Sequence, residues 1–395
     1  MPGEYPQNLY FISSLLLSFR CMLLLDQYIL KKFAVPFIYC IVGFIAIWLV
    51  WNLSTNLPDF VQGHITFGAL IHFYATQIPN VIVQSIPVGT LLAILYSMTQ
   101  MSRSNEIISI LCSGRSLYRI FVPFFLVGLF LVIVSGYFNY QKAPQAEALK
   151  NQLIDEMKNG KKINKLIQNH LFRNRLGNRT WYVQSLDLKN QLAHQVQIIQ
   201  QDPTGNIVEK WYITDASFNP TNHTWTFVQM HHVLVDPIGN ILTFDFSEQC
   251  QIDDWSESPW RIASSSMNPD LLGVPELKMY LQNNSDFPKA RLAPFFTHLD
   301  YRWALPWTCF IVILLSAPLG VIYSRRSILS GVALAVGLFA AMLFSSNLFL
   351  ALGKGYRCPA WIAAWGPNIV FAAIGIYLIW IKATGRELLK FRWPK

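Results

Sequence analysis

A short polar segment in the first third of the chain carries the residues best suited to a specific chemical contact. The segment runs from Ser102 to Ser116. Ser104 can cap the start of a short helix, and Gly114 can end that helix in the left-handed region. Glu106 then falls in the first turn, where the helix dipole favours a carboxylate. The sequence therefore predicts a short helix near 104–113.

One side of this predicted helix is apolar, because Ile107, Ile108 and Leu111 fall on the same side. Two interpretations are open. The helix can lie on lipid headgroups as an amphipathic surface helix, or it can dock on a cytoplasmic protein. Spacing alone favours the first interpretation and leaves the second open.

Enzymatic and metal-binding signatures are missing from the sequence. We find no G-x-x-x-x-G-K-[ST] loop for ATP, and no H-E-x-x-H or G-x-S-x-G motif. His231 and His232 are neighbours in a predicted strand and would point to opposite faces, so they would not share a metal. The six cysteines include no C-x-x-C pair. We therefore expect no catalytic site, no metal site and no cofactor.

The composition indicates a membrane protein. Of 395 residues, 53% are hydrophobic and only 13% are charged, whereas a soluble domain has about a quarter charged residues. A helix needs about 20 apolar residues to cross a bilayer. The predicted spans are Phe33–Pro58, 79–101, Ile120–Gln141, Trp303–Ser324, Ser327–Gly353 and Cys358–Ile381. These spans lack the carboxylates typical of ion-coupled carriers, so the energy for any transport would come from outside the chain.

The distribution of Lys and Arg predicts the orientation. The net charge is +9, and the basic residues gather before the first span, in the loops after the second and fourth, and after the sixth. This pattern predicts that both termini are cytoplasmic, including the tail 384–395, and that the segment between spans three and four faces outward, which in a Gram-negative cell is the periplasm. Residues 1–21 lack the features of a signal peptide. Our hypothesis is that they form an N-terminal extension from an upstream start codon.

The segment 143–290 is predicted to be a soluble domain inserted between helices 22–142 and helices 291–383. It begins with a polar helical stretch and then alternates apolar and polar residues. The predicted strands are Trp181–Val183, Val196–Ile199, Ile207–Ile213, Trp225–Val235 and Ile241–Phe246. Two similar segments, Asp202–Ile207 and Asp236–Ile241, each have Pro second and Gly fourth, which predicts hairpin turns. The expected fold is thus membrane α-helical with an inserted all-β domain of the sandwich or jelly-roll type.

Several short motifs resemble, in the same order, those of the lipopolysaccharide export permease family. In the polar segment these are Arg103-Ser104-x-Glu106 and Ser113-Gly114. The family normally has Arg where Gln27 stands here. The further similar motifs are Asp26-Gln27-Tyr28-Ile29, Pro144-Gln145-Ala146-Glu147, Leu305-Pro306, Pro318-Leu319-Gly320, Arg325-Arg326 and Pro359 to Asn368. The resemblance covers about Met22 to Ile381.

The resemblance implies a permease subunit of an ABC-type complex that extracts lipopolysaccharide from the outer leaflet of the inner membrane. The implied partners are a homologous permease subunit, a cytoplasmic ATPase dimer and periplasmic jelly-roll bridge proteins that receive the lipid. ATP hydrolysis is expected in the separate ATPase, in agreement with the missing ATP motif. The short helix would dock in a groove of that ATPase. The implied coupling residue is Glu106, with Arg103, Ile107, Leu111 and Gly114 in the same segment.

Basic residues at the outer membrane level are candidates for contact with lipid phosphates. Some family members carry Lys near the outer end of the first span, but Trp48 to Phe60 has no cation here. The candidates are Lys142, Lys150, Arg302, Lys354 and Arg357. Snorkelling of these side chains to the interface explains their positions equally well.

Two other functions remain open on the sequence alone. The first is an ABC-type permease that exports another lipid or lipoprotein, and the second is a membrane-anchored scaffold whose β domain is the working part. Nucleic acid is not an expected partner, because no basic run is interleaved with aromatic residues.

Overall fold

The computed structural model describes residues 7–62, 67–159, 166–236, 238–253, 255–265, 267–321 and 328–384. The chain divides into two compact units. The helical unit comprises Met1–Pro58, Phe67–Ala146 and Thr297–Lys395, and the β unit comprises Asp59–Thr66 and Glu147–Phe296. Residues 1–6 of the predicted extension, Arg325-Arg326 and residues 385–395 of the predicted tail lie outside the described residues.

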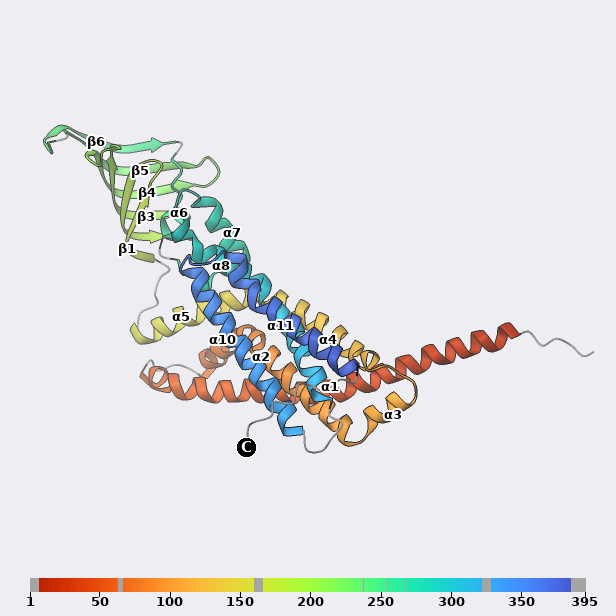
Figure 1. The fold of residues 1–395 in the computed structure, drawn as a ribbon. Helices are drawn as coiled ribbons and strands as arrows, with labels where there is room; N and C mark the ends of the chain where they lie inside the picture. Colours follow the sequence, from red (N-terminus) through yellow and green to blue (C-terminus); the bar gives the residue numbers. More distant parts are fainter. Residues whose placement is uncertain are drawn as a thin grey trace, which may run out of the picture. The chain divides into compact units, whose positions relative to one another are not determined.

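The helices before the sheet are α1 (Gln7–Gln62), α2 (Phe67–Arg103), α3 (Glu106–Cys112), α4 (Leu117–Tyr137), the π-helix η1 (Phe138–Lys142) and α5 (Ala143–Asn159). Those after the sheet are α6 (Pro259–Ser264), the 3₁₀ helix η2 (Pro269–Leu271), α7 (Val274–Asn283), α8 (Lys289–Ala304), α9 (Trp307–Gly320), α10 (Ile328–Lys354) and α11 (Ala360–Ala383). Figure 1 shows α1 as one long helix.

The predicted spans are confirmed as long apolar helices. Five described helices are long and apolar enough to cross a bilayer, or six if the pair α8 and α9 is one bent span. The region before 79–101 is continuous with the second span in α2, although the helix contains Pro79 and Pro87.

The fourth span is broken at Leu305-Pro306, where α8 and α9 meet at 52°. A break inside a bilayer leaves carbonyl groups that other parts of the protein must satisfy. Asn139 donates its side-chain amide to the carbonyl of Arg302 at 2.6 Å, and Asn368 donates to the carbonyl of Ala304 at 2.8 Å. Asn139 belongs to the π-helix η1, so two irregular backbone segments meet at this point.

Helix α9 forms the centre of the helical unit, where it packs against α2, α4, α10 and α11. Small residues allow these close approaches, as is common between membrane helices. A Cβ atom on Gly320 would lie 2.5 Å from Cβ of Met98, and one on Gly375 would lie 2.7 Å from Cβ of Leu314. Neither Gly320 nor Gly375 therefore has room for a side chain without a shift of its neighbours.

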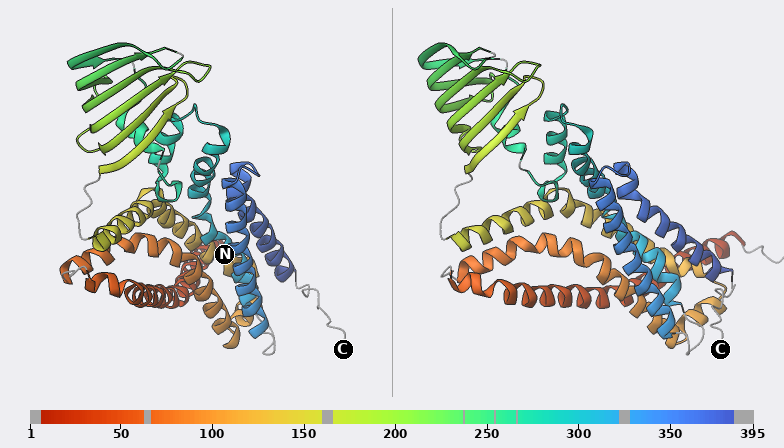
Figure 2. Two further views of the ribbon diagram at one scale, coloured as in Figure 1. Left: turned by 90° about the vertical axis from the view of Figure 1, so that its left-hand side faces the viewer. Right: turned by 60° about the vertical axis from the view of Figure 1, so that its left-hand side comes forward.

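The inserted β domain is confirmed as one antiparallel six-stranded sheet. Its strands are β1 (Leu166–Asn174), β2 (Arg179–Asp187), β3 (Leu192–Gln201), β4 (Ile207–Asn219), β5 (Thr224–Val235) and β6 (Ile241–Ile252). They lie side by side in sequence order, as Figure 2 shows. Both predicted turns are present, with Gly205 and Gly239 at φ of 95° and 96°. The described strands thus form a single meander rather than the two sheets of a sandwich or jelly roll.

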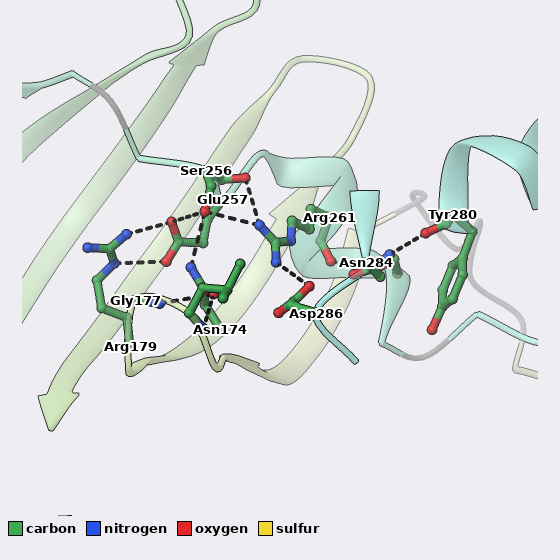
Figure 3. Close-up of polar contacts among 11 residues, drawn as sticks. Asn174, Gly177, Arg179, Ser256, Glu257, Arg261, Tyr280, Asn284 and Asp286 are labelled. Carbon is green, nitrogen blue, oxygen red and sulfur yellow. Dashed lines mark hydrogen bonds and ion pairs between the residues drawn. The ribbon is translucent and has the colours of Figure 1, made fainter. Parts of the chain in front are cut away.

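Residues that follow β6 cover the buried face of the sheet, where a second sheet would lie in a sandwich. Trp255 packs against Trp181 and Trp211, with ring centroids 5.6 and 5.7 Å apart. The side chain of Glu257 is fully buried and forms a two-pronged ion pair with Arg179, at 2.8 and 3.0 Å (Figure 3). This pair fastens the segment after β6 to strand β2.

The polar network of Figure 3 continues from Glu257 into the helices of the β unit. Asn174 of β1 donates to Ser256 at 3.2 Å, and Arg261 of α6 donates to Ser256 at 3.0 Å and to Asp286 at 2.7 Å. Each of these contacts joins the sheet to the segment that follows β6, or joins two parts of that segment to each other. The network therefore gives the β unit a polar core in addition to its aromatic one.

Candidate functional site

The predicted short helix is present as α3, but its start differs from the expectation. The N-cap is Asn105, at φ 59°, rather than Ser104. The hydroxyl of Ser104 instead lies 2.8 Å from the carboxylate of Glu106 and 3.0 Å from the carbonyl of Gln100, and its single hydrogen can be donated to either. Gly114 follows the helix at φ 83°, as predicted for a left-handed terminator.

The carboxylate of Glu106 is held by side chains of α1. The hydroxyl of Tyr28 donates to Oε2 at 3.0 Å, and the ammonium of Lys32 donates to Oε1 at 3.3 Å. Partial burial raises the pKa of Glu106, but hydrogen bonds from Ser104, Tyr28 and Lys32 outweigh it and leave the pKa below the usual value. Glu106 is therefore an ionised side chain near neutral pH, still a quarter exposed at 26%.

The apolar side of α3 packs inward. Ile107 is only 1% exposed and belongs to the hydrophobic core of the helical unit, with Leu111 packed against it. Ile108 is 41% exposed, and Ser109 and Cys112 are exposed beside it. The surface that α3 offers to another molecule is thus the side with Ile108, Ser109 and Cys112. Ile107 has a packing role that the sequence pattern did not distinguish from a docking role.

Arg103 is the last residue of α2 and is exposed. A cation in the last turn interacts favourably with the carbonyl end of the helix. Arg103, Glu106 and the exposed side of α3 lie close in sequence around the turn between α2 and α3. This region combines the C-terminal end of α2 with the ionised carboxylate of Glu106 and the exposed apolar side chain of Ile108.

A second candidate site is a cavity of about 440 Å³ within the helical unit. It lies beside the break between α8 and α9. The polar residues that line it are Asn80, Gln84, Asn139, Tyr301, Arg302, Thr308, Ser346, Asn347 and Asn368. Among the described residues of its lining, Arg302 is the only one with a charge. A cavity with amide groups and a guanidinium, and with no carboxylate in this lining, suits an anionic polar group.

Only one of the five predicted lipid-contacting cations lines this cavity. Arg302 is half-buried, and its guanidinium donates to the side chain of Asn139 at 3.2 Å. Lys150 forms an ion pair with Glu147 at 3.2 Å. Lys142 and Arg357 are exposed, and Lys354 is half-buried in the last turn of α10. The structure therefore does not gather the five cations into one site.

Sequence reasoning missed the partners of both sites. Tyr28 and Lys32 are four residues apart on one helix, a spacing that places two side chains on the same face, but no local signal connects them to Glu106. Asn139 and Asn368 are isolated amides within apolar stretches. Polar side chains in spans usually have a function or a partner, and this is the signal that could have identified them.

A comparison with family models matches residues 27–381 to the model described as lipopolysaccharide export system permease LptF/LptG. A search of curated proteins found no match.

Proposed function

We propose, because the chain belongs to the lipopolysaccharide export system permease family LptF/LptG, that it is the permease subunit of an ABC-type complex. The family and the apolar helices make it a multi-pass protein of the inner membrane that functions in lipopolysaccharide export. In the proposed complex, the subunit extracts lipopolysaccharide from the outer leaflet and passes it to a periplasmic bridge. The observation that carries the proposal is the family match over almost the whole chain.

The proposed source of energy is a separate cytoplasmic ATPase dimer that docks on α3. The chain has no phosphate-binding loop for ATP. The exposed side of α3 and the ionised Glu106 support this role, because a carboxylate and an apolar side chain together can enter a basic groove. Glu106 would make the charged contact and Ile108 the apolar one. Arg103 and Gly114 would fix the two ends of the docking segment.

The proposed second partner is a homologous permease subunit. Only 6% of the apolar window of α1 and 17% of that of α10 is buried within this chain, against 72% for α2. Trp51, Ile47 and Phe344 are examples of the large exposed side chains that these two helices carry. If α1 and α10 pack against a second subunit, with lipid between the two subunits, the small buried fraction of these two spans is explained.

The cavity beside the broken span is proposed to receive a phosphate group of the lipid. Its position within the helical unit and the guanidinium of Arg302 support this assignment. Arg forms charge-assisted hydrogen bonds to phosphate that are about twice as strong as neutral ones. Asn139 would hold the guanidinium in position through its 3.2 Å hydrogen bond.

The first test is the lipid content of the purified complex. We expect native mass spectrometry of the wild-type complex to show bound lipopolysaccharide, and Arg302→Gln to lower its occupancy about tenfold or more, because a charged hydrogen bond contributes about 1.5–3 kcal/mol. Lys31→Gln removes an exposed cation of the same unit that is not a candidate for lipid contact, and it is the matched control. Equal occupancy in Arg302→Gln and wild type would overturn the role of the cavity. Another lipid or a lipoprotein in the wild-type complex would overturn the substrate.

The orientation is a further proposal, with both termini in the cytoplasm and the β unit in the periplasm. We expect a membrane-impermeant maleimide to leave Cys112 unlabelled in intact spheroplasts and to label it after lysis, in a variant that retains only this cysteine. Cys112 is exposed on α3, so the reagent can reach it once the membrane is opened and any protein bound to α3 is removed. Labelling of Cys112 in intact spheroplasts would reverse the topology.

A further inference from the structure

The first half of α1 carries two side chains that bind Glu106 of α3, the helix proposed to dock on the ATPase. Tyr28 and Lys32 lie one helical turn apart, and the ammonium of Lys32 also lies 5.3 Å from the centre of the Tyr28 ring. Both side chains donate to Glu106, which is 78 and 74 residues away in the chain. We call the contact of Lys32 and Tyr28 with Glu106 the α1 latch.

The α1 latch occupies both oxygens of the carboxylate that is proposed to couple to the ATPase. Oε2 of Glu106 accepts a hydrogen bond from Tyr28, and Oε1 lies within hydrogen-bond distance of Lys32 and Ser104. An arginine that approaches a carboxylate in the usual two-pronged geometry needs both oxygens. The Lys32 contact is the longest of the three, at 3.3 Å, and the Lys32 side chain is 25% exposed. Lys32 is therefore the partner that an incoming cation can replace with least loss.

The same part of α1 has a second and separate attachment. Arg119 of α4 donates to Asp26 at 2.6 Å. Beyond these polar contacts the helix is poorly covered, since only 6% of its apolar window is buried in the chain. Ile29 and Phe33, which lie beside these polar residues on α1, are buried and belong to the hydrophobic core. A change at Lys32 thus acts on the span that is least tied to the rest of the helical unit.

We propose that the Lys32 contact of the α1 latch is exchanged on docking: a basic group of the ATPase takes the place of Lys32 on Glu106 and loosens that part of α1 from α3, while Asp26 and Arg119 stay paired. This inference rests on the proposed function, which supplies the ATPase. It makes Lys32 a positioning residue for the coupling carboxylate. It also gives docking a direct route to the span that is proposed to face the second subunit and the lipid.

The first experiment measures the reactivity of the Lys32 amine in the full chain in lipid nanodiscs. An amine-reactive reagent and mass spectrometry give the labelling of Lys32 relative to Lys31, its exposed neighbour, as an internal control. We expect Lys32 to react more slowly than Lys31, because its ammonium is paired. Glu106→Gln should raise Lys32 labelling severalfold without a change at Lys31. Equal labelling of Lys32 in wild type and Glu106→Gln would overturn the α1 latch itself.

The second experiment adds the ATPase that co-purifies with the tagged wild-type chain and that carries a phosphate-binding loop. The exchange predicts that Lys32 labelling rises on docking toward the level seen in Glu106→Gln. It also predicts that Lys32→Met binds the ATPase about two- to fivefold more tightly, the effect of removing a competing exposed ion pair. Lys32→Arg should restore wild-type affinity, and Lys31→Met should leave affinity unchanged.

Weaker binding by Lys32→Met than by Lys31→Met would overturn the exchange, because Lys32 would then support docking rather than compete with it. Docking without any rise in Lys32 labelling would do the same. A wild-type chain that binds no such ATPase would instead overturn the proposed function. The Glu106→Gln comparison in the isolated chain keeps these two failures distinct.

Discussion

Replacement of Glu106 by alanine is expected to weaken docking of the ATPase about tenfold to a hundredfold. A hydrogen bond to a charged group contributes about 1.5–3 kcal/mol, and each 1.4 kcal/mol is about tenfold in affinity. Folding should survive, because exposed ion pairs contribute at most about 1 kcal/mol and the Lys32–Glu106 pair is a quarter exposed on both sides, at 25% and 26%. The measurement is ATP hydrolysis and lipid release by the reconstituted complex, together with ATPase affinity.

The control for this variant is Glu248→Ala, which removes one exposed carboxylate from β6 of the other unit. Ile108→Asp should weaken docking as well, because Ile108 lies on the exposed side of α3. Ile107→Asp would place a charge in the core of the helical unit and would report on folding instead. Wild-type hydrolysis and lipid release by Glu106→Ala, at normal expression, would remove the docking role of α3.

Replacement of Glu257 by alanine is expected to destabilise the β unit by about 3–5 kcal/mol, the usual cost of removing one partner from a buried ion pair. The variant leaves Arg179 facing Trp255 without its carboxylate; at present the guanidinium lies 4.5 Å from that ring. For a unit of this size the loss corresponds to a fall of about 10 °C in melting temperature. Limited proteolysis of the full-length protein over a temperature series would measure it.

The matched control is Asp215→Asn, which breaks the exposed pair between Asp215 and His194 on the same sheet. That change should lower the free energy of unfolding of the β unit by at most about 1 kcal/mol. Equal proteolysis of Glu257→Ala and Asp215→Asn at every temperature would show that the network of Figure 3 contributes little to stability.

Acid should destabilise the β unit through the same carboxyl group. Burial raises the pKa of Glu257, but hydrogen bonds from Arg179 and Asn174 and the charge of Arg179 outweigh it, so the pKa lies below the usual value. A depressed pKa in the folded state stabilises the protein above the unfolded pKa of about 4.3, and this stabilisation is lost as the pH falls through the folded pKa. Glu257→Gln should therefore show a shallower loss of stability below about pH 4.3.

Sequence patterns correctly predicted those elements that depend only on residues close together in the chain. A run of about 20 apolar residues has to be a span, and the two segments with Pro second and Gly fourth have to turn because Gly accepts positive φ. Strand β1 was missed, because His170 and Asn174 are polar residues that the tertiary structure buries. The hydroxyl of Ser265 lies 2.7 Å from Nε2 of His170, and Asn174 donates to Ser256 at 3.2 Å. Burial of these two residues depends on partners more than 80 positions away.

The sequence by itself determined the membrane class, the inserted β domain, the turns and the presence of a short helix followed by Gly114. These follow from hydrophobic length, alternation and the allowed φ of single residues. Only the tertiary structure decided that Glu106 meets Lys32, that Ile107 faces inward while Ile108 faces outward, and that Arg302 alone of the five cations lines the cavity. Such contacts join residues far apart in the chain. Their formation depends on how whole helices pack, and no local spacing encodes that.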